Sequence, residues 1–92
     1  MAKERLQAEI YGDVQMVGFR AFASRHARSL KLSGYVRNRP DGSVEVAAEG
    51  ERASLEDFLS ELRRGPNSAT VENVEVSWQQ PTDEFSGFHI AY

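Results

Sequence analysis

Residues 12–20 read Gly12-Asp13-Val14-Gln15-Met16-Val17-Gly18-Phe19-Arg20, a short turn that begins with glycine and closes with arginine. An alternating strand pattern precedes it over residues 5–13, and a helical pattern follows it. Backbone N–H groups at a strand-to-helix junction converge on anions, and an arginine there adds charge and a planar pair of donors. The stretch therefore predicts a turn that binds a phosphoryl group.

Outward from this turn, the hydrophobic pattern predicts two helices and four further strands. The first helix runs from Ala21 to about Leu32, ends before Gly34 and presents an apolar stripe that includes His26. The second covers residues 52–64 or begins at Ser54, where a capping-box spacing occurs. The strands are expected at residues 34–39, 43–49, 70–80 and 84–92, and the last should point Phe88, Ile90 and Tyr92 inward.

This order, β-α-β-β-α-β plus one strand, predicts an α+β, ferredoxin-like fold in a single domain over residues 1–92. An antiparallel sheet should carry two helices on one face and an extra C-terminal strand. The first two strands flank a crossover helix and should be parallel, with the third strand between them. The 12–20 turn and Asn38 should therefore lie at the same edge of the sheet.

Composition excludes several classes of function. The net charge of −3 argues against nucleic-acid binding through a general basic surface. The absence of cysteine excludes disulfides and thiolate chemistry. His26 is expected to be a packing residue and His89 to face the surface, so no metal site is predicted, and glutamates such as Glu45 and Glu49 are expected on solvated faces. The polar N-terminus and the lack of a long apolar run predict a cytoplasmic protein with no membrane segment.

Two side chains are candidates for chemistry, and each has a simpler alternative. Arg20 is unfavourable near a helix N-terminus, which suggests a bound anion, but it could instead pair with Asp13 or Glu9. Asn38 is unusual in a strand and could orient a water or a substrate oxygen. Local sequence alone favours the simpler alternative, in which Asn38 begins the turn before Pro40-Asp41-Gly42, a role that suits asparagine.

Two segments resemble the signatures of the acylphosphatase family. Residues 12–20 resemble G-x-V-Q-G-V-x-F-R, and the run Gly34-Tyr35-Val36-Arg37-Asn38, continued to Gly50, resembles the second signature. The resemblance covers essentially the whole chain. It implies an enzyme that hydrolyses the carboxyl-phosphate bond of acyl phosphates to a carboxylate and inorganic phosphate.

The resemblance also implies roles for individual residues. Arg20 would bind the phosphoryl group together with the backbone N–H groups of Gln15, Met16, Val17, Gly18 and Phe19, and Asn38 would orient the attacking water. Positioning and charge stabilisation would suffice, without a metal or cofactor. The expected partners are a small acyl phosphate and inorganic phosphate as product and inhibitor, with no nucleic acid or membrane, and the expected state is a monomer.

Met16 departs from the family pattern, which usually has glycine at this position. In one interpretation, the backbone here is ordinary and the side chain points out of the cradle. In the other, the loop is distorted and activity is reduced. Two further functions therefore stay open: a non-catalytic module that binds phosphate or carbamoyl phosphate, and a regulatory or assembly domain on the same fold.

Overall fold

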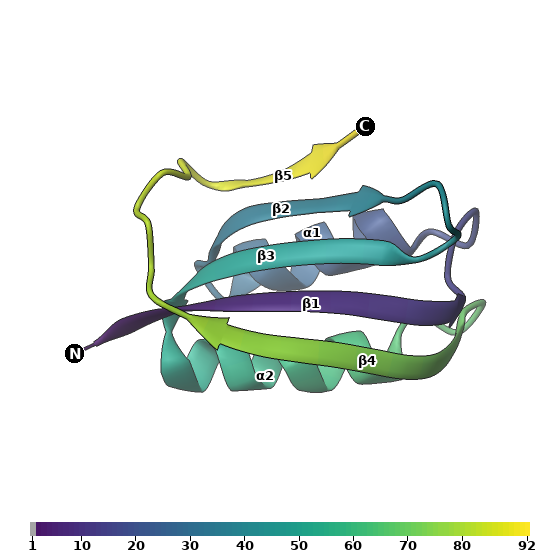
Figure 1. The fold of residues 1–92 in the computed structure, drawn as a ribbon, viewed down its shortest axis with the longest axis horizontal. Coiled ribbons are helices and arrows are strands. Elements are labelled where there is room, and N and C mark those ends of the chain that lie inside the picture. The colour runs from purple at the N-terminus through teal and green to yellow at the C-terminus, as the bar shows by residue number, and fades with distance from the viewer. Residues whose placement is uncertain (1) are drawn as a thin grey trace.

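The computed structural model describes residues 2–92, and Met1 lies outside this range (Figure 1). Five strands and two helices form the predicted α+β, ferredoxin-like fold, which is confirmed. In chain order the elements are β1 (Lys3–Asp13), α1 (Phe19–Ser29), β2 (Ser33–Asn38), β3 (Val44–Glu51), α2 (Arg52–Arg64), β4 (Thr70–Gln79) and β5 (Phe88–Ala91).

The strands form one sheet in the order β4-β1-β3-β2-β5. Both β1 and β2 pair antiparallel with β3, so β1 and β2 run parallel on either side of it, as predicted. Their C-terminal ends therefore share one edge of the sheet. The last strand, β5, pairs parallel with β2, so the sheet is mixed and only β4-β1-β3-β2 is antiparallel. As a result, β5 also ends at the edge that carries the turn.

Helix α1 is shorter at its end than predicted, because Lys31 and not Gly34 terminates it. Lys31 adopts a left-handed φ of 60°, its N–H donates to Arg28 O, and Leu32 N–H donates to Ala27 O. These two bonds make a Schellman motif with lysine at the usual glycine position. Gly34 instead lies in β2, where a Cβ would come within 1.9 Å of Ala47 O. This glycine is needed for strand pairing, not for stopping the helix.

The final strand also differs from the prediction, since it covers only Phe88–Ala91 and residues 80–87 form a loop. Phe88 is buried and Ile90 packs against the core, as predicted. Tyr92 was predicted to point inward, but its side chain is 97% exposed. An alternating pattern shows which residues share a face of a strand, but not where the strand stops pairing.

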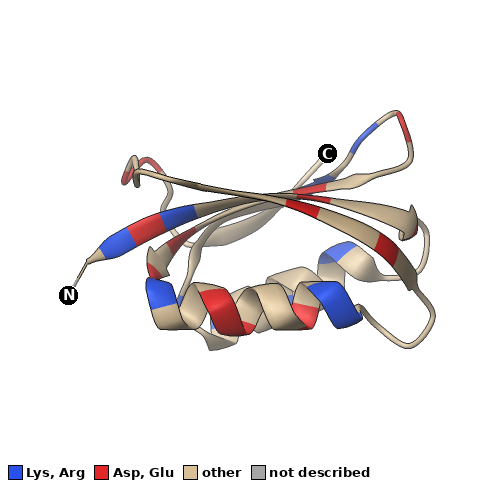
Figure 2. Cartoon of the chain, turned by 60° about the horizontal axis from the view of Figure 1, so that its bottom comes forward, with Lys and Arg blue, Asp and Glu red and all other residues tan. Residues whose placement is uncertain are grey.

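Charges of both signs are interspersed along the strands and helices in the view of Figure 2. The elements in this view therefore carry no unbroken run of Lys and Arg of the kind that binds nucleic-acid phosphates. Among residues 2–92, no helix has the length and apolar character that crossing a membrane would require.

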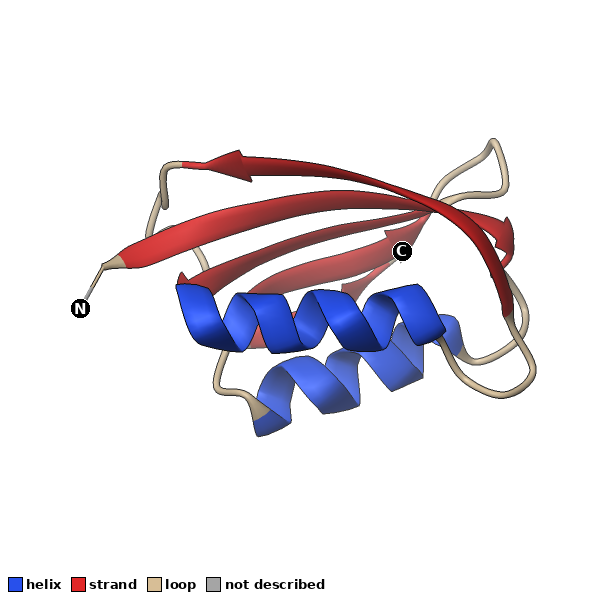
Figure 3. Ribbon diagram, turned by 90° about the horizontal axis from the view of Figure 1, so that it is seen from below, coloured by secondary structure: helices blue, strands red, loops and turns tan. Residues whose placement is uncertain are grey.

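The core lies between the sheet and the two helices, which cover the same face (Figure 3). Every second residue of β1 enters it, because side chains alternate between the faces of a strand. The largest fully buried side chains are Phe19, Phe58, Phe88, Leu6, Ile10, Leu55 and Leu62. Phe19, the first residue of α1, thereby fixes the helix start and the end of the 12–20 turn.

On the opposite face, the 80–87 loop is attached to the sheet through Glu49, which was predicted to be solvated but is buried. Its carboxylate accepts hydrogen bonds from Thr82 N–H at 3.0 Å, Thr82 Oγ1 at 2.8 Å and Asp83 N–H at 2.9 Å. Arg5 Nη1 completes the set at 3.1 Å, and its guanidinium stacks on Phe85 at 5.2 Å. The loop that leads into β5 is therefore fixed by one carboxylate.

Glu49→Gln should lower the free energy of unfolding at pH 7 by about 2 kcal/mol, because it weakens four hydrogen bonds to a buried carboxylate. Burial alone would raise the pKa of Glu49, but the bonds from Thr82, Asp83 and Arg5 outweigh burial and the pKa lies below its ordinary value. The ionised Glu49 carboxylate therefore contributes its full stability above the pKa of the unfolded state, about 4.3. This stability is lost as pH falls through the lower pKa of the folded state.

Urea unfolding of wild type and Glu49→Gln between pH 3 and 8 measures this difference, which should shrink at the acid end. Glu75→Gln, on an exposed strand position, is the matched control and should change stability by less than about 0.5 kcal/mol. If the difference in free energy of unfolding between wild type and Glu49→Gln did not change with pH, the ionised Glu49 carboxylate would not be the stabilising group.

Gly34→Ala should destabilise the fold by about 3 kcal/mol or more, because the new Cβ would collide with the backbone of β3. Gly42→Ala is the control: its φ of 94° is also positive, but a Cβ there meets nothing within 4 Å. It should cost only about 1 kcal/mol. If urea unfolding shows the same loss of stability in Gly34→Ala and Gly42→Ala, the positive φ of Gly34, and not its contact with β3, is the reason that glycine is needed there.

Candidate active site

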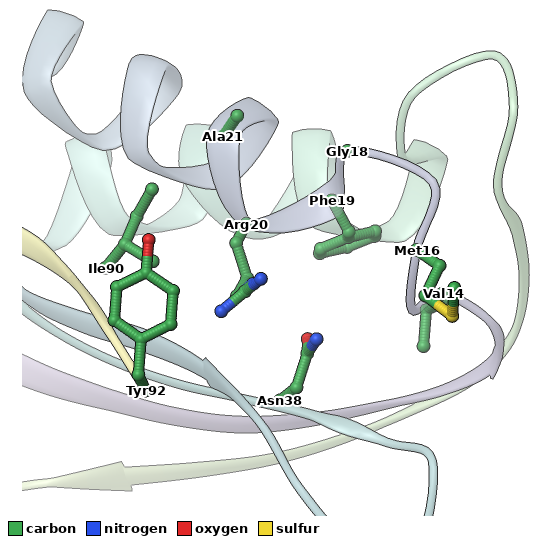
Figure 4. Close-up of a pocket in the computed structure, with 9 residues that line it drawn as sticks. All are labelled: Val14, Met16, Gly18, Phe19, Arg20, Ala21, Asn38, Ile90 and Tyr92. Atoms are coloured by element: carbon green, nitrogen blue, oxygen red, sulfur yellow. The ribbon is translucent and has the colours of Figure 1, made fainter.

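The candidate site lies where β1, β2 and β5 end at one edge of the sheet. A cavity of about 230 Å³ opens there between the 12–20 turn, the start of α1 and the ends of β2 and β5 (Figure 4). It is smaller than the roughly 300–1,000 Å³ of typical drug-sized pockets, which suits a small anion. Its lining is formed by Val14, Met16, Gly18, Phe19, Arg20, Ala21, Asn38, Ile90 and Tyr92.

The turn has a backbone suited to anion binding. Met16 and Gly18 adopt left-handed φ values of 63° and 78°, whereas Gln15 and Val17 do not. Alternation of left- and right-handed residues makes a concavity of N–H groups. Within the described chain, the N–H groups of residues 15–19 donate no hydrogen bond to another protein group. These donors lie beside the N-terminus of α1, where the helix dipole also favours an anion.

Two side chains hold the turn from opposite sides. Gln15 Nε2 donates to Arg39 O at 2.7 Å and to Ser43 O at 2.8 Å, which ties the turn to the β2–β3 connection. Ser68 Oγ donates to Val17 O at 2.8 Å. The side-chain role of Gln15 was missed because its partners lie 24 and 28 residues away. Gln15 therefore fixes the turn relative to Asn38, which directly precedes Arg39.

Arg20 is the second residue of α1 and reaches the cavity next to Asn38 (Figure 4). No carboxylate of the described residues lies within 4 Å of its guanidinium, and Glu9 pairs with Arg39 instead, at 3.8 Å. The alternative in which Arg20 pairs with Asp13 or Glu9 therefore does not occur. Its Cζ lies 4.8 Å from the ring centroid of Tyr92. The positive charge remains available to a ligand.

Asn38 is the last residue of β2 and lies opposite Val44 of β3. Its side chain points toward Arg20 (Figure 4) and forms no hydrogen bond to the residues that the structure describes. The turn that follows relies on Asp41, whose Oδ1 accepts from Ser43 N–H at 2.9 Å and Ser43 Oγ at 2.6 Å. These bonds hold the pKa of Asp41 below its ordinary value. Asn38 is therefore not the residue that starts the turn.

Met16 combines parts of both sequence interpretations. Its side chain is 99% exposed and lies at the rim of the cavity, so it does not fill the turn, in keeping with the first interpretation. Its backbone is not ordinary, however, because φ is 63°. A non-glycine residue in this conformation costs about 1–2 kcal/mol. The loop therefore keeps the conformation that glycine favours, at the expense of local strain.

The other candidate side chains are placed away from the cavity. The His26 ring packs on Phe22 with centroids 4.5 Å apart, and His89 is exposed. Across residues 2–92, no three His, Asp or Glu side chains come together as a metal-binding group.

Comparison with known proteins relates the whole chain to one family. The sequence model of the family described as Acylphosphatase matches residues 6–90. The chain is 52% identical to an acylphosphatase of Thermus thermophilus, over 94% of this chain and 97% of the relative. The crystal structure of acylphosphatase from Bacillus subtilis superposes with a TM-score of 0.93 at 34% identity, covering 97% and 99% of the two chains.

A similar unit also occurs inside a larger protein. Full-length HypF, in a phosphate- and nucleotide-bound form, matches with a TM-score of 0.86 at 27% identity, over 98% of this chain but only 12% of HypF.

Met16→Gly should stabilise the protein by about 0.5–1 kcal/mol, because glycine adopts the left-handed conformation without strain. Part of that gain is offset by the greater freedom of glycine in the unfolded chain. Met16→Ala is the control, since it removes the side chain but keeps the strain, and its stability should match wild type. Thermal and urea unfolding measure both variants. A loss of stability in Met16→Gly would contradict the strain at this position.

Proposed function

This chain belongs to the acylphosphatase family and hydrolyses acyl phosphates to a carboxylate and inorganic phosphate, and we propose that Arg20, Asn38 and the 15–19 backbone form its active site. One observation carries the proposal. The Arg20 and Asn38 side chains line one cavity together with Met16, Gly18 and Phe19 of the turn. In the described chain, neither side chain has a hydrogen-bond or ion-pair partner, and the N–H groups of residues 15–19 donate to no protein group. Polar groups left unpaired together favour a polar ligand.

Arg20 and the 15–19 backbone bind the phosphoryl group. The guanidinium offers two parallel N–H donors that match the geometry of phosphate oxygens. The N–H groups of the turn and the dipole of α1 add further positive potential. No Asp or Glu side chain lines the cavity, so no acidic side chain there repels the phosphoryl oxygens. Because these groups are fixed before the substrate arrives, they stabilise charge in the transition state without reorganising.

Asn38 orients the water that attacks phosphorus. Its amide oxygen accepts a hydrogen bond from the water and thereby directs an oxygen lone pair to phosphorus. The cavity lining holds no His, Asp or Glu side chain that could serve as a general base. A phosphoryl oxygen of the substrate takes the proton instead. The new P–O bond forms as the bond to the acyl oxygen breaks, and the carboxylate leaves with that electron pair.

Three further parts of the proposal concern the whole molecule: residues 1–92 work as one domain, as a monomer, and in the cytoplasm. Met16 and Tyr92 are the exposed large hydrophobic residues of the described chain, and both lie at the cavity. The other large apolar side chains of these residues are buried or partly buried, which favours a monomer. Sedimentation and cell fractionation test the oligomeric state and the location.

Arg20→Ala should lower kcat/KM for benzoyl phosphate by at least about 100-fold, because charge and bidentate geometry are lost together. Arg20→Lys should restore only part of the activity, since an ammonium lacks the planar donor pair. Asn38→Ala should lower kcat more than it raises KM, because the water is positioned for the chemical step. Phosphate should inhibit wild type competitively.

Arg25→Ala is the matched control, because Arg25 lies on an exposed position of α1 away from the cavity. It should stay within about twofold of wild type. Circular dichroism confirms folding of each variant. Wild-type activity in folded Arg20→Ala would contradict the site, and phosphate binding without turnover by wild type would indicate the non-catalytic module.

A further inference from the structure

Exposed apolar side chains are concentrated at one place in this protein. Met16 is 99% and Tyr92 97% exposed, while the other large hydrophobic residues of the described chain are at least partly buried. Both line the candidate active site and flank it from opposite sides (Figure 4). Single exposed apolar residues are common, but two at the mouth of one functional cavity call for a ligand with an apolar part.

The side chains that line the cavity also favour a ligand with an apolar part. Apart from Arg20 and Asn38, the lining side chains are apolar or aromatic, with Ile90 beside Tyr92 and with Val14 and Phe19 buried (Figure 4). Arg20 is the one cationic lining residue, and the phosphoryl group engages it. A second anionic group on the substrate would therefore find no further cationic side chain in this wall, whereas burying an apolar group against it is favourable.

Strand β5 brings Tyr92 to the mouth of the cavity, beside Arg20. Its ring lies 4.8 Å from the Arg20 guanidinium, and the preceding strand is held in register by the Val36–Ile90 pair. Phe88, at the start of β5, is anchored in the core, and Arg28 Nη2 donates to its carbonyl at 3.1 Å. An aromatic ring with only two side-chain torsions loses little entropy when it contacts a ligand.

We propose that Tyr92 and Met16 form the acyl subsite and that it selects acyl phosphates with an apolar, above all aromatic, acyl group. The inference rests on the proposed function, since it assumes that Arg20 and the 15–19 backbone hold the phosphoryl group. One bridging oxygen separates that group from the acyl carbon, so the acyl group lies at the mouth of the cavity. Tyr92 stacks against it, and the adaptable Met16 side chain covers the other side.

The test compares benzoyl phosphate with acetyl phosphate, which share the reacting bond but differ in apolar surface. The measured quantity is the ratio of kcat/KM for benzoyl phosphate to kcat/KM for acetyl phosphate. In Tyr92→Ala this ratio should fall by about fivefold or more, because a stacking contact is lost for one substrate only. Tyr92→Phe keeps the ring and should retain the ratio. In Met16→Ala, which keeps the strained backbone, the ratio should fall by about twofold.

The outcomes separate this inference from the proposed function. A lower ratio in Tyr92→Ala, with the ratio retained in Tyr92→Phe, supports the subsite. An unchanged ratio in Tyr92→Ala and Met16→Ala overturns it. An equal loss for both substrates, with a higher Ki for inorganic phosphate, also overturns it, because Tyr92 would then act only by positioning Arg20. If wild type hydrolysed neither substrate, the proposed function itself would fail, whatever the variants did.

Discussion

The parallel course of β1 and β2 on either side of β3 is the constraint on which the site depends. Because parallel strands end at the same edge, it brings the turn after β1 and Asn38 of β2 together, although they lie about 20 residues apart in the chain. Pairing register matters as much as direction, since a shift of one residue would turn Asn38 to the opposite face of the sheet. Gln15 then links the two parts directly through Arg39 O and Ser43 O.

The sequence predicted those parts of the fold and site that depend on local pattern. Hydrophobic periodicity located α2 from Arg52 to Arg64 and β4 from Thr70, and the crossover rule placed Arg20 and Asn38 at one edge. The parts that it missed depend on contacts between distant residues. Glu49 resembles any exposed strand glutamate until the 80–87 loop covers it, and the partners of Gln15 lie beyond the next strand.

Met16 and Lys31 show a second limit, which is conformational. Both adopt left-handed φ values that side chains rarely accept, so residue preference predicts the opposite backbone at each position. At both positions, the surrounding contacts outweigh the free-energy cost of the left-handed backbone. Leu32 is buried directly after Lys31, and Val17 and Gln15 on either side of Met16 are held by Ser68 and by the β2–β3 connection.

The attachment of β5 divides the site into parts of different mobility. Its first residue, Phe88, is 2% exposed and meets Phe58 with ring centroids 5.8 Å apart, so it moves only when the core opens. Its far end carries Tyr92 into solvent, where side-chain motion is fast. The turn proposed to hold the phosphoryl group is tied down by Gln15 and Ser68, whereas the Tyr92 side chain is free to move. With the acyl subsite proposed above, such a division would let one fixed reaction geometry serve apolar acyl groups of varied shape, so selection for an apolar surface and catalytic precision need not compete in this fold.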